Sequence, residues 1–316
     1  MGLKISSGTV PRAQKIVLYG VEGIGKTTLA SKAPDVLFID TEGGTAFMDV
    51  KRIDGITTWS ALLNAINEVA ANPDLCRTLA IDTADWAEQA MIQHVLKVRS
   101  LKSIEDAGYG KGYTYLAEEF VNLLKACDNV ISAGVNVIIT AHAKMRKQEL
   151  PDEMGAFDRW ELKLSKQCAP LLKEWADAVL FCNYKTIVVT GENNVKKGTG
   201  GRRVIYTCHK PAFDAKNRHG LPDEMDMTYE NIAPIFERTA SLNRPVSAET
   251  LNALADKMEA DGVTAAEVEA LLVEKGKIEP GVHLNDCSEL FCGGWLKQNW
   301  GRVVKTILSK PEKMPF

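Results

Sequence analysis

A glycine-rich segment near the start of the chain has the residue types and spacing of a phosphate-binding loop. Residues 20–27 read GVEGIGKT and fit the pattern G-x4-G-K-[ST]. Glycines let backbone amides curl around a phosphate, Lys26 reaches the β- and γ-phosphate oxygens, and the hydroxyl of Thr27 ligates Mg²⁺. The pattern therefore predicts a site for ATP and Mg²⁺. The residues assigned to this site are Gly20, Val21, Glu22, Gly23, Ile24, Gly25, Lys26, Thr27 and Thr28.

Three further polar side chains each follow an apolar run that reads as a strand. Asp82 is expected to join Thr27 as a ligand of Mg²⁺, although an aspartate there could equally cap the next helix. Glu42 could orient and deprotonate an attacking water, or be an ordinary loop acid. His142 could sense the γ-phosphate, although a lone histidine is more often structural. We predict Glu42, Lys26 and His142 as catalytic residues, and Thr27 and Asp82 as metal ligands.

The elements that must position these residues alternate between strand and helix. Short apolar runs predict buried strands, and apolar residues every three or four positions predict helices. The alternation predicts a mostly parallel sheet with helices on both faces, which binds its ligand at the carboxyl edge. The expected strands are 15–19, 36–40, 78–82, 135–140 and 178–182, and the expected helices begin at 27 and cover 59–71, 84–98, 114–128 and 169–175.

The pattern changes after these elements. Two β-rich runs, 186–190 and 203–208, flank a loop over 191–201 and predict an antiparallel hairpin at the sheet edge. A linker at 243–245 precedes two amphipathic helices, 247–260 and 264–275. We therefore expect an N-terminal tail (1–13), an α/β P-loop core (14–243) and a small helical C-terminal domain (244–316).

Composition narrows the functional classes. A net charge of −3 provides no global basic field to attract nucleic acid, so any such contact must be local. The seven cysteines form no CxxC pair, which indicates a reducing compartment. His283, Cys287 and Cys292 are too few and too loosely spaced for a zinc site. With neither a signal peptide nor a membrane-spanning run, we expect a cytoplasmic protein without membrane contact.

Several segments resemble RecA-type recombinases in sequence and order along the chain. The segment 38–42 (FIDTE) resembles the strand that ends in the catalytic glutamate of that family, and 81–83 (IDT) resembles its Walker B strand. His142 stands where that family carries a switch glutamine. The chain is more closely similar to bacteriophage RecA-like ATPases of the single-strand annealing or recombination type. The resemblance implies that the α/β core over 14–243 has the RecA-like P-loop NTPase fold, with the β-hairpin at the edge of its sheet. That closer resemblance covers about residues 14–240 and is carried by 108–113 (GYGKGY), 172–177 (LKEWAD) and 210–222 (KPAFDAKNRHGLP).

The resemblance implies two loops that face single-stranded DNA, at 99–115 and 144–166. Aromatic side chains between cations suit a single strand, because stacking on aromatic rings tolerates any base. Acidic residues in the second loop almost cancel its positive charge, so it could instead be a solvated lid. The expected DNA contacts are Tyr109, Lys111, Tyr113, Arg146, Lys147, Arg159, Trp160 and Lys163.

The resemblance also implies a cation that reaches the ATP of a neighbouring subunit. The candidates are Lys210, Lys216 and Arg218, which could equally form a basic surface loop. The predicted function is a Mg²⁺–ATP-dependent, single-stranded-DNA-binding ATPase. It would support phage-type recombination or annealing as a ring or filament, with a single-strand-binding protein as a further partner, in the host cytoplasm if a phage encodes it. The alternatives are a P-loop kinase of a small molecule or nucleotide and a non-hydrolysing ATP-binding adaptor.

Overall fold

The computed structural model describes residues 12–149, 155–190, 196–240 and 246–309. The chain forms two compact units, one covering Ala13–Phe236 and one that contains the chain from Glu237 onward. The division between the units falls within helix α6 (Tyr229–Ala240). The predicted domain boundary at 243/244 lies outside the described residues.

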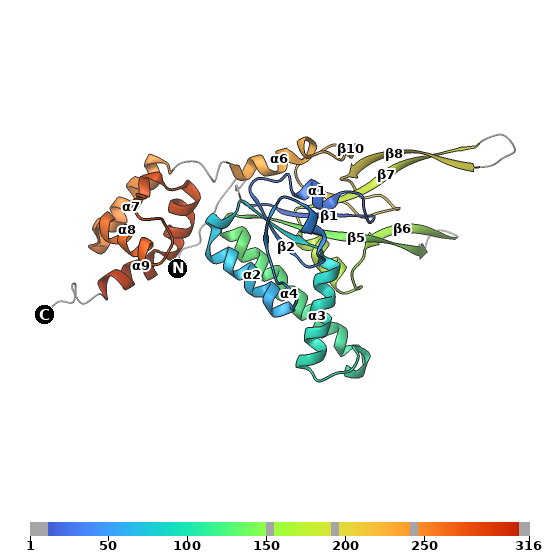
Figure 1. Cartoon of the computed structure of the whole chain (residues 1–316), viewed down its shortest axis with the longest axis horizontal. Helices are drawn as coiled ribbons and strands as arrows, with labels where there is room; N and C mark the ends of the chain where they lie inside the picture. Colours follow the sequence, from blue (N-terminus) through green and yellow to red (C-terminus); the bar gives the residue numbers. More distant parts are fainter. Residues whose placement is uncertain (1–11, 150–154, 191–195, 241–245, 310–316) are drawn as a thin grey trace, which may run out of the picture. The chain divides into compact units, whose positions relative to one another are not determined.

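A ten-stranded mixed sheet forms the centre of the first unit (Figure 1). Its main path runs in the order β10-β8-β7-β1-β5-β4-β2-β3. The six strands from β7 to β3 are parallel, and β8 and β10 pair antiparallel at the other edge, so the predicted mostly parallel sheet is confirmed. The strands of this path are β1 (Lys15–Gly20), β2 (Val36–Asp40), β3 (Lys51–Ile53), β4 (Thr78–Asp82), β5 (Asn136–Glu149), β7 (Ala178–Thr190), β8 (Lys196–Tyr206) and β10 (Glu224–Asp226).

Successive side chains along each strand point to opposite faces of the sheet and pack into two separate hydrophobic cores. Val17 and Tyr19 of β1 belong to one buried cluster, whereas Ile16 and Leu18 belong to the other. Strands buried on both faces read as continuous apolar runs, which explains why the sequence revealed them. Four helices cover the first face: α2 (Trp59–Ala71), α3 (Ala84–Val98), α4 (Lys111–Ser132) and α5 (Cys168–Trp175). The second face carries α1 (Lys26–Ala30) and α6, as Figure 1 shows.

Two long antiparallel ribbons extend from the same end of the sheet (Figure 1). Residues 143–149 of β5 pair with β6 (Ala156–Leu162), so the predicted loop at 144–166 is wrong for most of its length. The predicted strands at 186–190 and 203–208 belong to the longer strands β7 and β8. The predicted loop at 191–201 is strand from residue 196, and 191–195 lie outside the described residues. Cross-strand pairing stabilises these polar ribbons, and single-sequence propensity does not register such pairing.

The second unit contains three α-helices in its described residues: α7 (Ala248–Asp261), α8 (Ala265–Glu274) and α9 (Lys297–Leu308). The predicted helix starts are confirmed, because Ser247 accepts from the amide of Thr250 and Thr264 forms a complete capping box with Glu267. Cys287 and Cys292 lie in the apolar core of this unit. Within the described parts of the chain, no helix is both long and apolar enough to cross a membrane.

Gly20 ends β1 between two neighbouring strands, paired with His142 of β5 and Cys182 of β7. A Cβ atom added there would lie 2.1 Å from the carbonyl oxygen of Cys182. We expect Gly20→Ala to lower the free energy of unfolding by about 1–3 kcal/mol, because the backbone must move to admit the methyl group. Gly44→Ala is the matched control, because an added Cβ there meets nothing within 4 Å. Urea unfolding checks this, and equal midpoints for the two variants would contradict it.

Candidate functional site

The phosphate-loop sequence connects β1 to α1 at the carboxyl edge of the sheet. Gly23 and Gly25 have φ values of +70° and +102°, in the region that favours glycine. Lys26 is 5% exposed, and its ammonium donates to the carbonyl oxygens of Gly20 (3.2 Å) and Val21 (3.1 Å). Burial lowers the pKa of Lys26. Among the described residues no carboxylate forms an ion pair with this lysine. A buried ammonium without a carboxylate partner is suited to bind the phosphate groups of a nucleotide.

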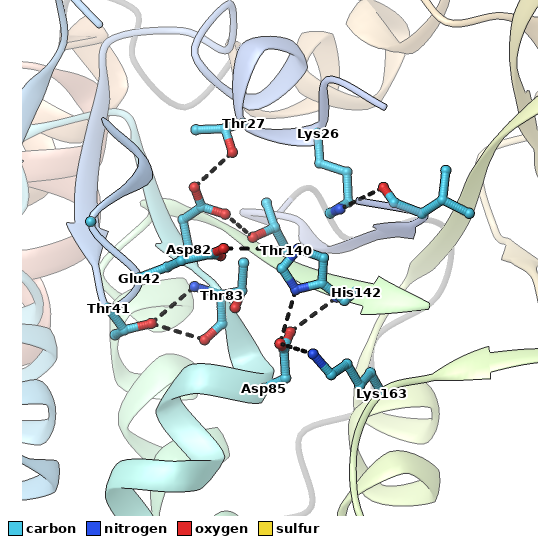
Figure 2. A network of polar contacts seen from close by, with 12 residues as sticks. Lys26, Thr27, Thr41, Glu42, Asp82, Thr83, Asp85, Thr140, His142 and Lys163 are labelled. Carbon is cyan, nitrogen blue, oxygen red and sulfur yellow. Dashed lines mark hydrogen bonds and ion pairs between the residues drawn. The ribbon is translucent and has the colours of Figure 1, made fainter. Parts of the chain in front are cut away.

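Asp82 joins three parts of the site (Figure 2). One carboxylate oxygen accepts a hydrogen bond from Thr27 Oγ1 at 2.7 Å, and the other accepts from the hydroxyl of Thr140. Burial raises the pKa of Asp82 above its ordinary range. The cap of α3 is Thr83, so the alternative helix-capping role of Asp82 is not realised. A threonine hydroxyl beside a carboxylate is an all-oxygen donor set that suits Mg²⁺, which would polarise the phosphoryl oxygens when bound.

Hydrogen bonds fix the loop that carries Glu42. The carboxylate of Asp40 accepts from the backbone amides of Glu42 (3.0 Å), Gly43 (2.6 Å) and Thr45 (2.8 Å). Thr41 Oγ1 donates to the carbonyl oxygen of Thr83 (3.0 Å) and accepts from its amide (2.9 Å), which ties this loop to the end of β4.

Partial burial raises the pKa of Glu42, and the neighbouring charges of Asp82 and Asp85 act in the same direction. The electrostatic effects of His142 and, to a smaller extent, of Lys26 oppose this rise only in part. A carboxylate with a raised pKa is suited to accept a proton from water.

His142 lies between two carboxylates (Figure 2). Its Nδ1 is 2.9 Å from Asp85 Oδ2, its backbone amide donates to Asp85 Oδ1 at 3.0 Å, and its Nε2 is 4.0 Å from Glu42 Oε1. In Asp85 these hydrogen bonds outweigh the effect of burial and lower the pKa of the carboxyl group. Asp85 therefore fixes the imidazole ring so that its far nitrogen faces Glu42.

Sequence reasoning missed Asp85. It lies in the first turn of α3, three residues after Asp82, and this spacing after a strand end was the available signal. Lys163 extends the network, because its Nζ is 3.9 Å from the same Oδ2 that contacts His142. The backbone amide of Lys163 also donates to the carbonyl oxygen of His142 at 2.8 Å. The end of the β5–β6 ribbon is thus attached directly to the site.

Some of the side chains expected to contact DNA are buried or packed within the protein, and others are exposed to solvent. Arg159 is buried, and its guanidinium donates to the carbonyl oxygen of Pro211 (2.7 Å) and to Asp214, which contradicts the prediction that it contacts DNA. Trp160 packs against the core, with its ring 6.2 Å from that of Phe181. Arg146, Lys147 and Lys163 on the ribbon are exposed, as are Tyr109, Lys111 and Tyr113. In the expected first loop, α4 already begins at Lys111.

The three cations expected to act on a neighbour's ATP are in different environments. The ammonium of Lys216 donates to the carbonyl oxygens of Lys173, Glu174 and Ala176 at the end of α5, so it serves the fold. Arg218 pairs with Asp177 at 3.1 Å. Lys210 lies over the ring of Tyr206, with its Nζ 5.9 Å from the centroid.

Arg203 is a further cation at the site that sequence reasoning missed. It lies on β8, and its Nη1 donates to the carbonyl oxygen of Ile24 in the phosphate loop at 3.4 Å. The same atom would lie 3.0 Å from a Cβ added at Gly25. Because 179 residues separate Arg203 from Ile24, no local pattern could have identified this contact.

Removing the buried ammonium tests the phosphate loop itself. We expect Lys26→Ala to weaken ATP binding about 10-fold or more, because charge-assisted hydrogen bonds to the phosphate oxygens are lost. Lys32→Ala, which removes an exposed cation shortly after α1, should leave the affinity unchanged. Isothermal titration with ATP and Mg²⁺ provides the measurement. Full affinity in Lys26→Ala would refute the assignment of the loop.

Asp85→Asn tests the orientation of His142. We expect kcat for ATP hydrolysis to fall about 10-fold or more with little change in KM, because the variant leaves the phosphate loop intact and disturbs the histidine. Glu88→Gln is the matched control. Glu88 is a buried carboxylate one turn further along α3, and it accepts from the amide of Ser165 without touching His142. Equal losses in both variants would show that Asp85 only anchors the ribbon.

One comparison with known proteins identifies the family of this chain. A family model described as an AAA domain matches residues 12–219, which covers the phosphate loop, Glu42, Asp82, His142 and Arg203. A comparison with functionally curated proteins found no match. The matched segment covers about two thirds of the 316 residues. The chain therefore belongs to the AAA domain family of P-loop ATPases.

Proposed function

We propose that this ATPase binds single-stranded DNA in an ATP-dependent manner and supports phage-type recombination or strand annealing as a ring or filament. One observation carries the proposal. Strand β5 runs without interruption from the buried core, past His142 at the nucleotide site, into the exposed ribbon that carries Arg146 and Lys147. A strand that is rigidly paired on both sides of His142 offers a direct mechanical connection between the two sites.

The residues of the site have distinct roles in this proposal. Thr27 and Asp82 hold Mg²⁺, and Lys26 holds the phosphates. Glu42 takes a proton from the attacking water, helped by its raised pKa. His142, held by its hydrogen bonds to Asp85, contacts the γ-phosphate, and a change in the position of His142 moves β5, of which it is part.

The proposed DNA surface follows the exposed side chains. On the ribbon these are Arg146, Lys147 and Lys163, of which Arg146 also lies 3.8 Å from Glu161. Near the start of α4 the exposed candidates are Tyr109, Lys111 and Tyr113. Cations contact the phosphates and tyrosine rings stack on bases, which gives affinity without sequence preference. The acidic chain as a whole requires this contact to stay local.

A binding titration tests the proposal. We expect a labelled oligothymidine to bind more tightly with Mg²⁺ and a non-hydrolysable ATP analogue than without, and the affinity to fall steeply as salt rises. We also expect the oligothymidine to stimulate ATP hydrolysis. Lys147→Gln should weaken binding without changing nucleotide affinity. Indifference to the oligonucleotide at low salt would refute DNA binding and leave the ATPase assignment intact.

The same measurements separate the alternatives. A kinase would consume ATP faster with a nucleoside than with the oligonucleotide. A non-hydrolysing adaptor would show the same negligible phosphate release in the wild type and in Glu42→Gln. Electron microscopy of the complex with oligonucleotide would reveal a ring or a filament.

A further inference from the structure

A cavity of about 590 Å³ lies beside the Glu42 loop, between the beginning of α2 and one face of α3. Six of its lining residues come from α3 and recur at helical spacing: Trp86, Gln89, Ala90, Gln93, His94 and Lys97. Residues spaced three or four apart lie on one side of a helix, so these side chains form one continuous wall of the cavity. The volume is within the range of about 300–1,000 Å³ typical of small-molecule sites.

The wall presents an aromatic ring and several polar groups to the cavity. Trp86 is 49% exposed, so the face of its indole ring is open to a planar ligand. Within the described residues, the side chains of Gln89, Gln93, His94 and Lys97 have neither a hydrogen bond nor an ion pair. Their donors and acceptors are therefore available to a ligand.

The charge of the lining selects among ligands. Lys97 lines the cavity and none of the lining residues is an aspartate or glutamate, although the chain contains more acidic than basic residues. An exposed indole ring, two free amides and an uncompensated lysine match the parts of a nucleotide. The ring stacks on a base, the amides bond to the edge of the base, and the ammonium pairs with a phosphate.

We propose that this cavity binds a nucleotide unit with an unpaired base, stacked on Trp86 with its phosphate at Lys97. The unit could belong to a single strand, in which case the inference rests on the proposed function, or it could be a free nucleoside monophosphate. The cavity is distinct from the phosphate loop, because no residue of 20–28 lines it.

The cavity adjoins the loop that carries Glu42. Thr41 lines the cavity and immediately precedes Glu42, and its hydroxyl is hydrogen-bonded to the backbone of Thr83, directly after β4. A second cavity of about 360 Å³, which includes Glu42, shares Thr41, Ile56 and Thr57 with the first. A nucleotide unit in the cavity therefore contacts the loop that holds the proposed water-activating carboxylate.

The test uses the full chain saturated with Mg²⁺ and a non-hydrolysable ATP analogue, so that the phosphate loop is filled. The two probes are a fluorescein-labelled 20-residue oligothymidine, followed by anisotropy, and thymidine monophosphate, followed by calorimetry. We expect Trp86→Ala to weaken one or both probes about 10-fold, because stacking on an aromatic ring is lost, and Trp86→Phe to retain most of the affinity. Lys97→Gln should weaken binding and reduce its dependence on salt.

Two control variants remove similar groups outside the cavity. Val98→Ala changes an exposed apolar residue of the same helix, and Lys125→Gln removes an exposed cation from α4. Both should bind the probes as the wild type does. Circular dichroism confirms that each variant is folded.

The binding data distinguish three cases: the cavity binds a unit of a strand, it binds a free nucleotide, or it binds neither. Weaker oligothymidine binding alone in Trp86→Ala assigns the cavity to a strand, and weaker thymidine monophosphate binding assigns it to a free nucleotide. Wild-type affinity for both probes in Trp86→Ala and Lys97→Gln would overturn the proposal, and oligothymidine binding by the wild type would then leave the proposed function standing. If the wild type binds neither probe, both the cavity and the DNA-binding proposals fall.

Discussion

The carboxylate of Asp82 is the point at which the separate parts of the nucleotide site are joined. Its two oxygens accept hydrogen bonds from Thr27 at the start of α1 and from Thr140 in β5. Both bonds exist because β5 lies between β1 and β4 in the sheet, which brings three segments remote in sequence to one edge. A buried carboxylate is costly without such partners, so the sheet order and the hydrogen bonds depend on each other. The rest of the site is arranged around this group.

From this point the structure extends in two directions. Towards β2, the hydrogen bond between Thr41 and Thr83 attaches the Glu42 loop to the end of β4. Hydrogen bonds from backbone amides of the loop to the carboxylate of Asp40 stabilise its conformation. Towards the ribbon, Asp85 clamps both the backbone and the ring of His142. The acid and the histidine therefore face each other from opposite sides, although neither is close enough for a direct hydrogen bond.

The same geometry connects the nucleotide site to the β5–β6 ribbon. The ribbon is a direct continuation of β5. At its other end, the backbone amide of Lys163 donates a hydrogen bond to the carbonyl oxygen of His142. The cavity along α3 adjoins the site through Thr41, which precedes Glu42. The ribbon is therefore hydrogen-bonded to His142, whereas the cavity borders the loop that carries Glu42.

The sequence by itself determined the phosphate loop, the strands of the sheet and the acidic or polar residues at their ends. Those features are local: the loop is a contiguous motif, a strand buried on both faces is a continuous apolar run, and parallel strands carry their functional residues at one edge. It also determined the capped helices of the second unit, because a capping box spans only four residues.

Only the tertiary structure decided which side chains are committed and which are available. Arg159 and Lys216 resemble the exposed cations in sequence, but their charges are used by Asp214 and by the end of α5. Asp85 meets His142 across 57 residues and Arg203 meets Ile24 across 179. Such contacts follow from strand order and register, and the energy of pairing distant segments leaves no mark in any short stretch of sequence.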